Sequence, residues 1–286
     1  MTGNFILDDL GFVEAHVEYL ASQSQMIQNS IRSDCPHFIE FQSYIRSKLF
    51  TIEAVNDFVE NRNHPVIILN RLAYALEEIC WHTLFAKERL DTIANWVSLP
   101  GGQDSIVKPY ISYYFHGLVS RGKATIDILG LMINHLFKLG INRERCGLDR
   151  GSITAELSKI YNQDQDRNYV EYLYQGIDKY RNNWIGDFYN LRNVVIHRHQ
   201  FGSLAVTASI SNITHPFSIL FREEDGHIEF IKKIAPRSII SGPVIDPTLF
   251  GNELWEKLVL LIEHVCKECF PQIDFFFSEF IPPDVT

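Results

Sequence analysis

Apolar residues recur every three or four positions over most of the chain, the spacing that places them on one face of an α-helix. The stripe is most regular over residues 66–96. We predict helices over residues 10–30, 38–61, 66–96, 103–139 and 152–161, from 170 into the 190s, and from 252 to about 270. We expect Gly122 to bend or split the fourth of these helices, and Pro271 to break or kink the last.

The hydrophobic period changes after Gly202. Short β-favouring runs cover residues 204–210, 218–221 and 227–231, and residues 223–226 resemble a hairpin turn. These runs predict a small antiparallel β meander inserted between helices at about 203–233. The expected fold is mainly α, with residues 1–65 as an N-terminal helical extension and residues 66–286 as an antiparallel helical bundle that carries the insertion.

Composition narrows the class of protein. Hydrophobic residues make up 46% and aromatic residues 13% of the 286 positions, which favours a densely packed globular protein. A formal net charge of −9 disfavours charge-driven coating of nucleic acid or anionic membrane, although it leaves room for a local basic site. The five cysteines, an odd number, favour reduced thiols and therefore the cytoplasm, and the start of the chain does not resemble a secretory leader. The sequence has no long apolar stretch, so we expect no membrane partner.

One segment combines the residue types that cleavage of a phosphodiester requires. Residues 192–199 read Arg-Asn-Val-Val-Ile-His-Arg-His. An arginine carries a permanently charged fork suited to phosphate, and an imidazole exchanges a proton near neutral pH. Basic residues outnumber acidic ones over residues 178–199, and the aromatic residues Tyr180, Trp184 and Tyr189 are interleaved with them. Such mixing suits single-stranded RNA, although Tyr180 and Trp184 fit a hydrophobic core better.

The geometry of this segment on a regular helix leaves two arrangements open. With Trp184 at zero and about 100° per residue, Arg181, Arg192 and His199 fall at about 60–80°. Asn193 and His197 share a polar face at about 180–220°. A helix that stays regular therefore groups Arg192 with His199 and Arg181. A helix that unwinds near residue 196 lets Arg192 turn toward His197, with Asn193 as an orienting amide.

The segment resembles the signature of the HEPN superfamily, in which an arginine, usually followed by a polar residue, precedes a histidine by four to six intervening residues. Arg192, Asn193 and His197 match the shorter spacing, and Arg192 with His199 matches the longer one. The resemblance covers residues 66–282, but it implies neither the β insertion within that range nor the first 65 residues. It implies a helical bundle that dimerises and brings two motifs together as a metal-independent RNase site. By the same resemblance, His197 is the general acid/base, Arg192 holds the scissile phosphate and Asn193 orients or assists.

The function that the resemblance implies is endonucleolytic cleavage of single-stranded RNA in a toxin or host-defence role. A neutral imidazole removes the proton of a ribose 2′-hydroxyl while an arginine stabilises the developing phosphorane, each contributing about 10²–10⁴-fold. Arg181, Arg198 and His199 are expected to bind substrate. No metal or cofactor is required; the expected partners are RNA, a second copy of the chain and an antitoxin or other protein.

Two alternatives compete with this expectation. A non-catalytic helical module could use the same surface to bind RNA, a nucleotide or another protein. In a purely structural role, Arg192 pairs with a carboxylate such as Asp187, and the histidines lie in solvent at a helix C-terminus, where the helix dipole favours positive charge.

Other residues capable of chemistry fit structural roles better. His264, Cys266 and Cys269 resemble half of a zinc site, but the sequence offers no second Cys-x-x-Cys pair. Cys80 has no evident catalytic partner and lies in an apolar stripe. His135 falls among apolar residues, which favours a histidine that is hydrogen-bonded in the core or at an interface.

Overall fold

A computed structural model describes residues 21–55, 64–97, 104–198, 205–206, 219–220 and 227–280 of the chain. The described part is mainly α-helical, as the periodicity predicts, and the helix over residues 21–34 precedes eight further α-helices. These are α2 (Pro36–Val55), α3 (Pro65–Val97), α4 (Asp104–Leu136), α5 (Ser152–Gln163), α6 (Asn168–Tyr180), α7 (Gly186–Asn193), α8 (His227–Ile234) and α9 (Pro247–Ser278). The predicted turn at residues 99–102 lies outside the described residues, as does the hairpin signal at residues 223–226.

Helix α9 is the central element of the bundle and contacts α2, α3, α4 and α6. Its N-terminus is fixed by Asp246, whose carboxylate accepts hydrogen bonds from the backbone N–H groups of Thr248 and Leu249 at 2.8 and 3.1 Å. Pro247 takes the first helical position, where no backbone donor is needed. The helix therefore begins five residues before the predicted start at residue 252. It also continues through Pro271, so the predicted break there is wrong.

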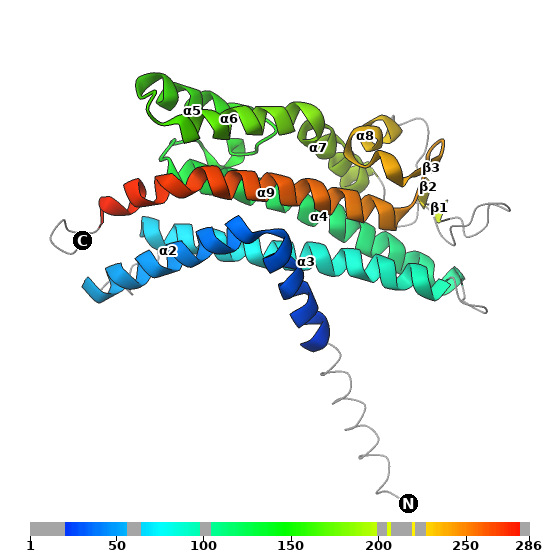
Figure 1. The fold of residues 1–286 in the computed structure, drawn as a ribbon. Coiled ribbons are helices and arrows are strands. Elements are labelled where there is room, and N and C mark those ends of the chain that lie inside the picture. Colours follow the sequence, from blue (N-terminus) through cyan, green and yellow to red (C-terminus); the bar gives the residue numbers. More distant parts are fainter. Residues whose placement is uncertain are drawn as a thin grey trace, which may run out of the picture.

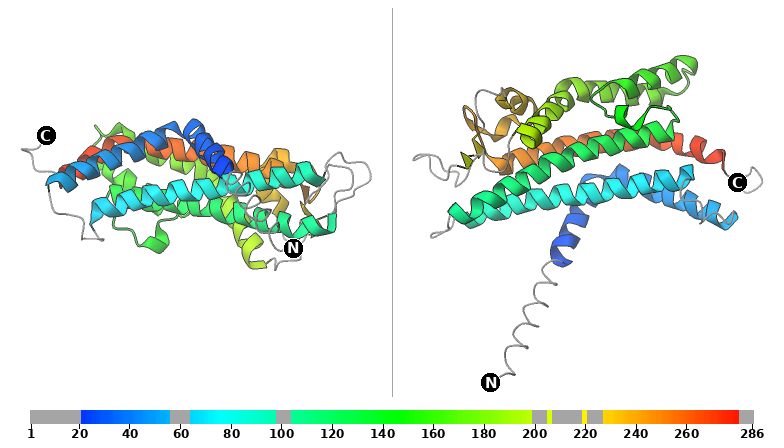
Figure 2. Two further views of the ribbon diagram at one scale, coloured as in Figure 1. Left: turned by 90° about the horizontal axis from the view of Figure 1, so that it is seen from below. Right: turned by 180° about the vertical axis from the view of Figure 1, so that it is seen from behind.

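The helices lie on both sides of α9 (Figure 1). Helices α2 and α3 cover one side, and α5, α6 and α7 cover the other. Helices α3 and α4 form a long antiparallel pair (Figure 2). Helix α4 is unbroken at Gly122, so the predicted split is wrong. A Cβ atom at this glycine would lie 2.9 Å from the ring of Phe188 and 3.3 Å from Leu254, so the small residue lets α4 approach α7 and α9 closely.

The first described residues share the main core. Ile27, Ile31, Phe38 and Phe41 are fully buried in the same hydrophobic cluster as α3 and α9. The carboxylate of Glu263 on α9 accepts hydrogen bonds from the first backbone N–H groups of α2, those of His37 and Phe38, at 3.2 and 3.1 Å. A negative charge at this position is favoured by the helix dipole and satisfies donors that have no partner within the helix.

A small antiparallel sheet has the strand order β1-β2-β4-β3. Its strands are β1 (Ala205–Val206), β2 (Ile219–Leu220), β3 (Ile239–Ser241) and β4 (Val244–Ile245). The predicted strands at 204–210 and 218–221 contain β1 and β2, which pair antiparallel. The prediction of a strand at 227–231 is wrong, because these residues open α8. Ile231 and Ile234 are buried, and lysines in the last turn favour a helix.

Helices α6 and α9 cross closely at Gly176 and His264, and this contact predicts a pH-dependent stability. A Cβ atom at Gly176 would overlap the imidazole of His264. Burial, the largest effect, lowers the pKa of His264, while the backbone carbonyls of Leu173 and Tyr172 act in the opposite direction. The unfolded chain keeps the ordinary pKa of about 6.5 and binds the proton more readily than the folded chain.

The free energy of unfolding should therefore fall as the pH drops below about 6.5 toward the lower pKa of the folded state, and this contribution should be constant above that range. Urea unfolding of the wild type and of His264→Gln at pH 5.5 and 7.5 measures the effect. The variant should lose part of the pH dependence. Equal pH dependence in both proteins would contradict this role for the buried imidazole.

Candidate functional site

The candidate motif lies at the end of a continuous helical segment that contains two wide turns. After α6, residues Arg181–Ile185 form a π-helical turn, α7 follows directly, and a second π-helical turn covers Val194–Arg198. A π turn closes i→i+5 hydrogen bonds, and such turns are frequent at functional sites. Each adds about one residue to the helix and shifts the following positions by about 100° around the axis. A wheel of constant pitch therefore does not describe this helix.

The structure places Arg181 apart from the motif. Its guanidinium forms an ion pair with Asp178 at 3.0 Å and donates a hydrogen bond to the hydroxyl of Thr154 on α5 at 3.2 Å. It also lies over Gly151, where an added Cβ would overlap it. Arg192 lies eleven positions further along the helix, about 16 Å at 1.5 Å per residue. The prediction that a regular helix groups Arg181 with Arg192 is therefore wrong, because Arg181 contacts Asp178 and Thr154.

Arg192 and Asn193 end α7, immediately before the second π turn. Arg192 is half-buried and Asn193 is exposed. The guanidinium Nη1 of Arg192 donates a hydrogen bond to the side-chain oxygen of Asn193 at 3.1 Å. The carboxylate of Asp187, considered above as a structural partner of Arg192, instead forms an ion pair with Lys233 of α8 at 3.0 Å. The amide oxygen therefore orients the arginine, and Asp187 links α7 to α8.

His197 and Arg198 belong to the second π turn, and His199 lies outside the described residues. On a regular α-helix, positions 192 and 197 are separated by about 140° around the axis. One extra residue in the intervening turn reduces this separation to about 40°. The two arrangements predicted from the sequence supposed either a regular helix or an unwound one at this point. The structure has neither, because Val194–Arg198 form a π-helical turn. The helix widens, and this brings position 197 closer in angle to position 192.

A polar pocket adjoins the motif one helical turn earlier, and the sequence did not identify it as a site. The hydroxyl of Tyr189 on α7 donates a hydrogen bond to Asp127 on α4, and Lys123 forms an ion pair with the same carboxylate. Burial is the largest cause of a raised pKa for Tyr189, so its hydroxyl stays protonated and donates. Asp149, in the segment before α5, also lines the pocket. The i,i+4 spacing of Lys123 and Asp127 could have been noticed, whereas the approach of Asp149 depends on the tertiary fold.

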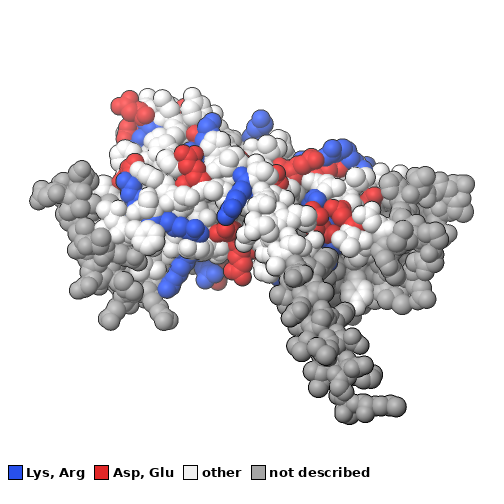
Figure 3. Space-filling model, turned by 60° about the horizontal axis from the view of Figure 1, so that its bottom comes forward, with Lys and Arg blue, Asp and Glu red and all other residues white. Residues whose placement is uncertain are grey.

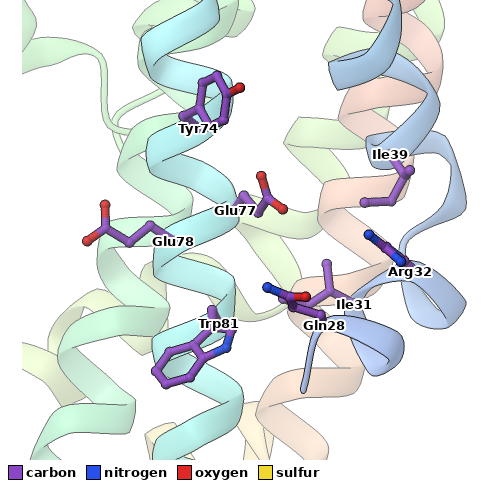
Figure 4. A pocket seen from close by; sticks show the side chains of 8 residues that line it. All are labelled: Gln28, Ile31, Arg32, Ile39, Tyr74, Glu77, Glu78 and Trp81. Atoms are coloured by element: carbon purple, nitrogen blue, oxygen red, sulfur yellow. The ribbon is translucent and has the colours of Figure 1, made fainter. Parts of the chain in front are cut away.

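A second pocket, of about 320 Å³, lies between α3 and the N-terminal helices (Figure 4). Tyr74, Glu77 and Trp81 of α3 line it together with Arg32 and Ile39, and Glu77 points toward the N-terminal helices. The carboxylate of Glu77 accepts hydrogen bonds from the side chain of Gln42 at 2.6 Å and from Arg46 at 3.4 Å. This carboxylate is therefore engaged in linking α2 to α3.

The remaining candidate residues occupy structural positions. Cys80, Cys266 and Cys269 are buried, and burial raises the pKa of each thiol. His135 forms a 2.7 Å hydrogen bond with the backbone carbonyl of Pro65. Trp184 is only 2% exposed, so it belongs to the core and does not offer a surface for base stacking. Within the residues that the structure describes, no group of three or more His, Cys, Asp or Glu side chains is arranged to hold a metal ion.

The surface carries both signs of charge. On the face shown in Figure 3, lysine and arginine side chains are interspersed with aspartate and glutamate. This mixture does not resemble a continuous basic field of the kind that binds nucleic acid without specific contacts.

Among the described helices, none combines the length and apolar character needed to cross a membrane. The chain matches no protein-family model, no curated protein and no solved structure.

Proposed function

We propose that this protein is a metal-independent endoribonuclease of the HEPN type that cleaves single-stranded RNA. The observation that carries the proposal is the contact between Arg192 and Asn193 at the start of the π turn that contains His197. A guanidinium held by a neighbouring amide beside a histidine-bearing turn is the arrangement that the motif requires. The mainly helical bundle around it is consistent with the fold that the resemblance implies.

The proposed chemistry uses only side chains of the chain. His197 in its neutral form removes the proton from a ribose 2′-hydroxyl, and the resulting oxygen attacks the adjacent phosphorus. Arg192 donates hydrogen bonds to the non-bridging oxygens and stabilises the negative charge that develops on them. The bond to the 5′-oxygen of the next nucleotide breaks, and this oxygen takes up a proton. The products are a 2′,3′-cyclic phosphate and a free 5′-hydroxyl.

A second copy of the chain completes the proposed site. One imidazole that removes a proton works best with a second that donates one to the leaving group. Two motifs meeting at a twofold axis supply both groups, and an antitoxin or other partner protein that covers this cleft would silence it. Arg198 and His199 are proposed to contact the RNA strand on either side of the scissile phosphate.

Incubation of the purified protein with end-labelled single-stranded RNAs in excess EDTA tests the proposal. We expect cleavage that is insensitive to EDTA, fragments that end in a 2′,3′-cyclic phosphate, and a dimer by light scattering at the assay concentration. Intact RNA across a panel of sequences would favour the non-catalytic binding module. Cleavage by a strict monomer would contradict the shared site.

A further inference from the structure

The pocket beside the motif, about 310 Å³ in volume, has two unlike walls. Ala124, Ile128 and Leu131 of α4, together with Ile79 of α3, supply an apolar wall. The opposite side is polar and includes Tyr189 and the segment before α5. A volume of this size is within the range of sites that hold one small molecule, which are typically apolar with a few placed polar groups.

The charged groups in the pocket are not equally available to a ligand. Arg143 and Glu144 also line it, but both are exposed residues. Asp127 is engaged by Lys123 and by the hydroxyl of Tyr189. Asp149 is less fully engaged. Its Oδ1 is buried against Gly147 without a hydrogen-bond partner, and its Oδ2 lies 4.0 Å from the Nε of Arg150, so Oδ2 is the oxygen through which this 21% exposed side chain can meet a ligand. Burial raises the pKa of Asp149, which means that its charged form would gain from additional hydrogen-bond donors. The arginine beside it is 58% exposed and can reach an anion at the mouth.

The pocket is held in a fixed position relative to the motif. Tyr189 precedes Arg192 by three residues and Asn193 by four on α7, so the three side chains share one side of the helix, with Cβ atoms about 5–6 Å apart. The segment that carries Asp149 is held against α4, where Gly130 meets the backbone carbonyl of Cys146. A ligand in the pocket therefore lies about one helical turn from the proposed catalytic arginine.

We infer that this pocket binds a guanine nucleotide, with the base against the apolar wall of α4, its N–H edge on the Asp149 carboxylate and its phosphate toward Arg150. The nucleotide is either free or part of an RNA strand. In the second case the inference extends the proposed RNase function, because it names the base that is held beside the scissile phosphate.

The choice of guanine follows from the hydrogen-bonding capacity of a carboxylate, which only accepts. Guanine presents two adjacent donors, N1–H and the 2-amino group, and both can converge on the one accessible oxygen of Asp149. In adenine and cytosine the amino group lies beside a ring nitrogen that accepts, and in uracil the single N–H lies between two carbonyls. Each of these would place an acceptor against the negative charge of Asp149. Single-stranded RNA is commonly recognised through such base edges.

Titration calorimetry with nucleoside monophosphates tests the inference on the wild-type protein. GMP should bind at least about 10-fold more tightly than AMP, CMP or UMP, because two hydrogen bonds to a charged acceptor depend on the guanine edge. Inosine monophosphate, which lacks only the 2-amino group, should bind about 10-fold more weakly than GMP. This comparison needs no variant, so it remains decisive if a substitution prevents folding.

Asp149→Asn should weaken GMP binding about 10- to 100-fold and remove the preference for guanine. The matched control is Glu229→Gln, which neutralises an exposed carboxylate on α8 that pairs with Lys232. It should bind GMP as the wild type does. Two results would overturn the inference. One is the absence of a guanine preference both in this titration and in the titration with RNA described below, and the other is a guanine preference that survives Asp149→Asn.

A second titration separates the two sources of the nucleotide. Oligouridine with one central guanosine is compared with plain oligouridine, using His197→Ala to prevent turnover. Asp149-dependent preference for the guanosine-containing strand assigns the pocket to RNA, whereas preference for free GMP alone assigns it to a soluble nucleotide. Cleavage is measured separately. A protein that binds guanine through Asp149 but leaves every RNA intact would refute the RNase and retain the pocket.

Discussion

Replacing Arg192 with alanine should lower the rate of RNA cleavage by about 10²–10³-fold, because the guanidinium stabilises charge that develops only in the transition state. His197→Ala should lower it by about 10²–10⁴-fold, since the proton acceptor is lost. Initial rates of cleavage of one labelled RNA in excess EDTA, measured under single-turnover conditions, give both ratios.

Two controls make these ratios specific to the motif. Arg167→Ala removes an arginine just before the start of α6, near the opposite end of the same long helical segment, where it pairs with Asp164. It should change the cleavage rate less than about threefold. Asn193→Ala removes the hydrogen-bond acceptor that orients Arg192 and should give an intermediate loss, about 10-fold. An Arg192→Ala protein that folds normally and cleaves at the wild-type rate would exclude the proposed role of this residue.

Gly130→Ala should cause a large loss of stability. A Cβ atom at this position would overlap the backbone carbonyl oxygen of Cys146 and lie 3.3 Å from Ile153. Backbone cannot rotate away as a side chain can, so α4 must separate from the segment before α5. Overpacking of this kind costs about 1–3 kcal/mol in the free energy of unfolding. Because the displaced segment carries Asp149, binding of GMP should weaken as well.

Gly117→Ala is the matched control on the same helix. The nearest atom to a Cβ at Gly117 is the Cβ of Ala86 at 4.0 Å, an ordinary van der Waals contact. Alanine is favoured over glycine inside a helix by about 0.5–1 kcal/mol, so this variant should match or exceed the wild type in stability. Urea unfolding of the two variants measures the contrast. Equal stabilities for Gly130→Ala and Gly117→Ala would contradict the close contact at Cys146.

The helices were predictable because each buries one face, and the errors have local causes. The stripe over residues 66–96 corresponds to α3 almost to the residue. Residues 227–231 were interpreted as a strand because Ile228 and Phe230 alternate over too short a window. The buried pair Ile231 and Ile234 reveals the helical spacing only when α8 is followed to its end. Strands β3 and β4, of three and two residues, are too short for any periodicity to reveal.

The candidate site was predictable in its residue types but not in its geometry. The joint presence of Arg192, Asn193 and His197 is visible in the sequence, and the position of the first two at the end of α7 agrees with the predicted helix. The two π turns were not predictable, because one extra residue in a helical turn leaves no clear periodic signal in the sequence. Arg181 lies apart from the motif because about 16 Å of helix lies between it and Arg192. The approach of Asp149 to Tyr189 also appears only in the folded chain.

The most direct measurement of the proposed function uses an RNA of mixed sequence in which one nucleotide, at a mapped cleavage position, carries a 2′-deoxyribose. In excess EDTA, cleavage after that nucleotide should disappear, while cleavage at the other mapped positions continues and leaves 2′,3′-cyclic phosphate ends. Continued cleavage at the substituted position would contradict attack by the 2′-hydroxyl, and a requirement for a divalent metal ion would contradict catalysis by Arg192 and His197 alone.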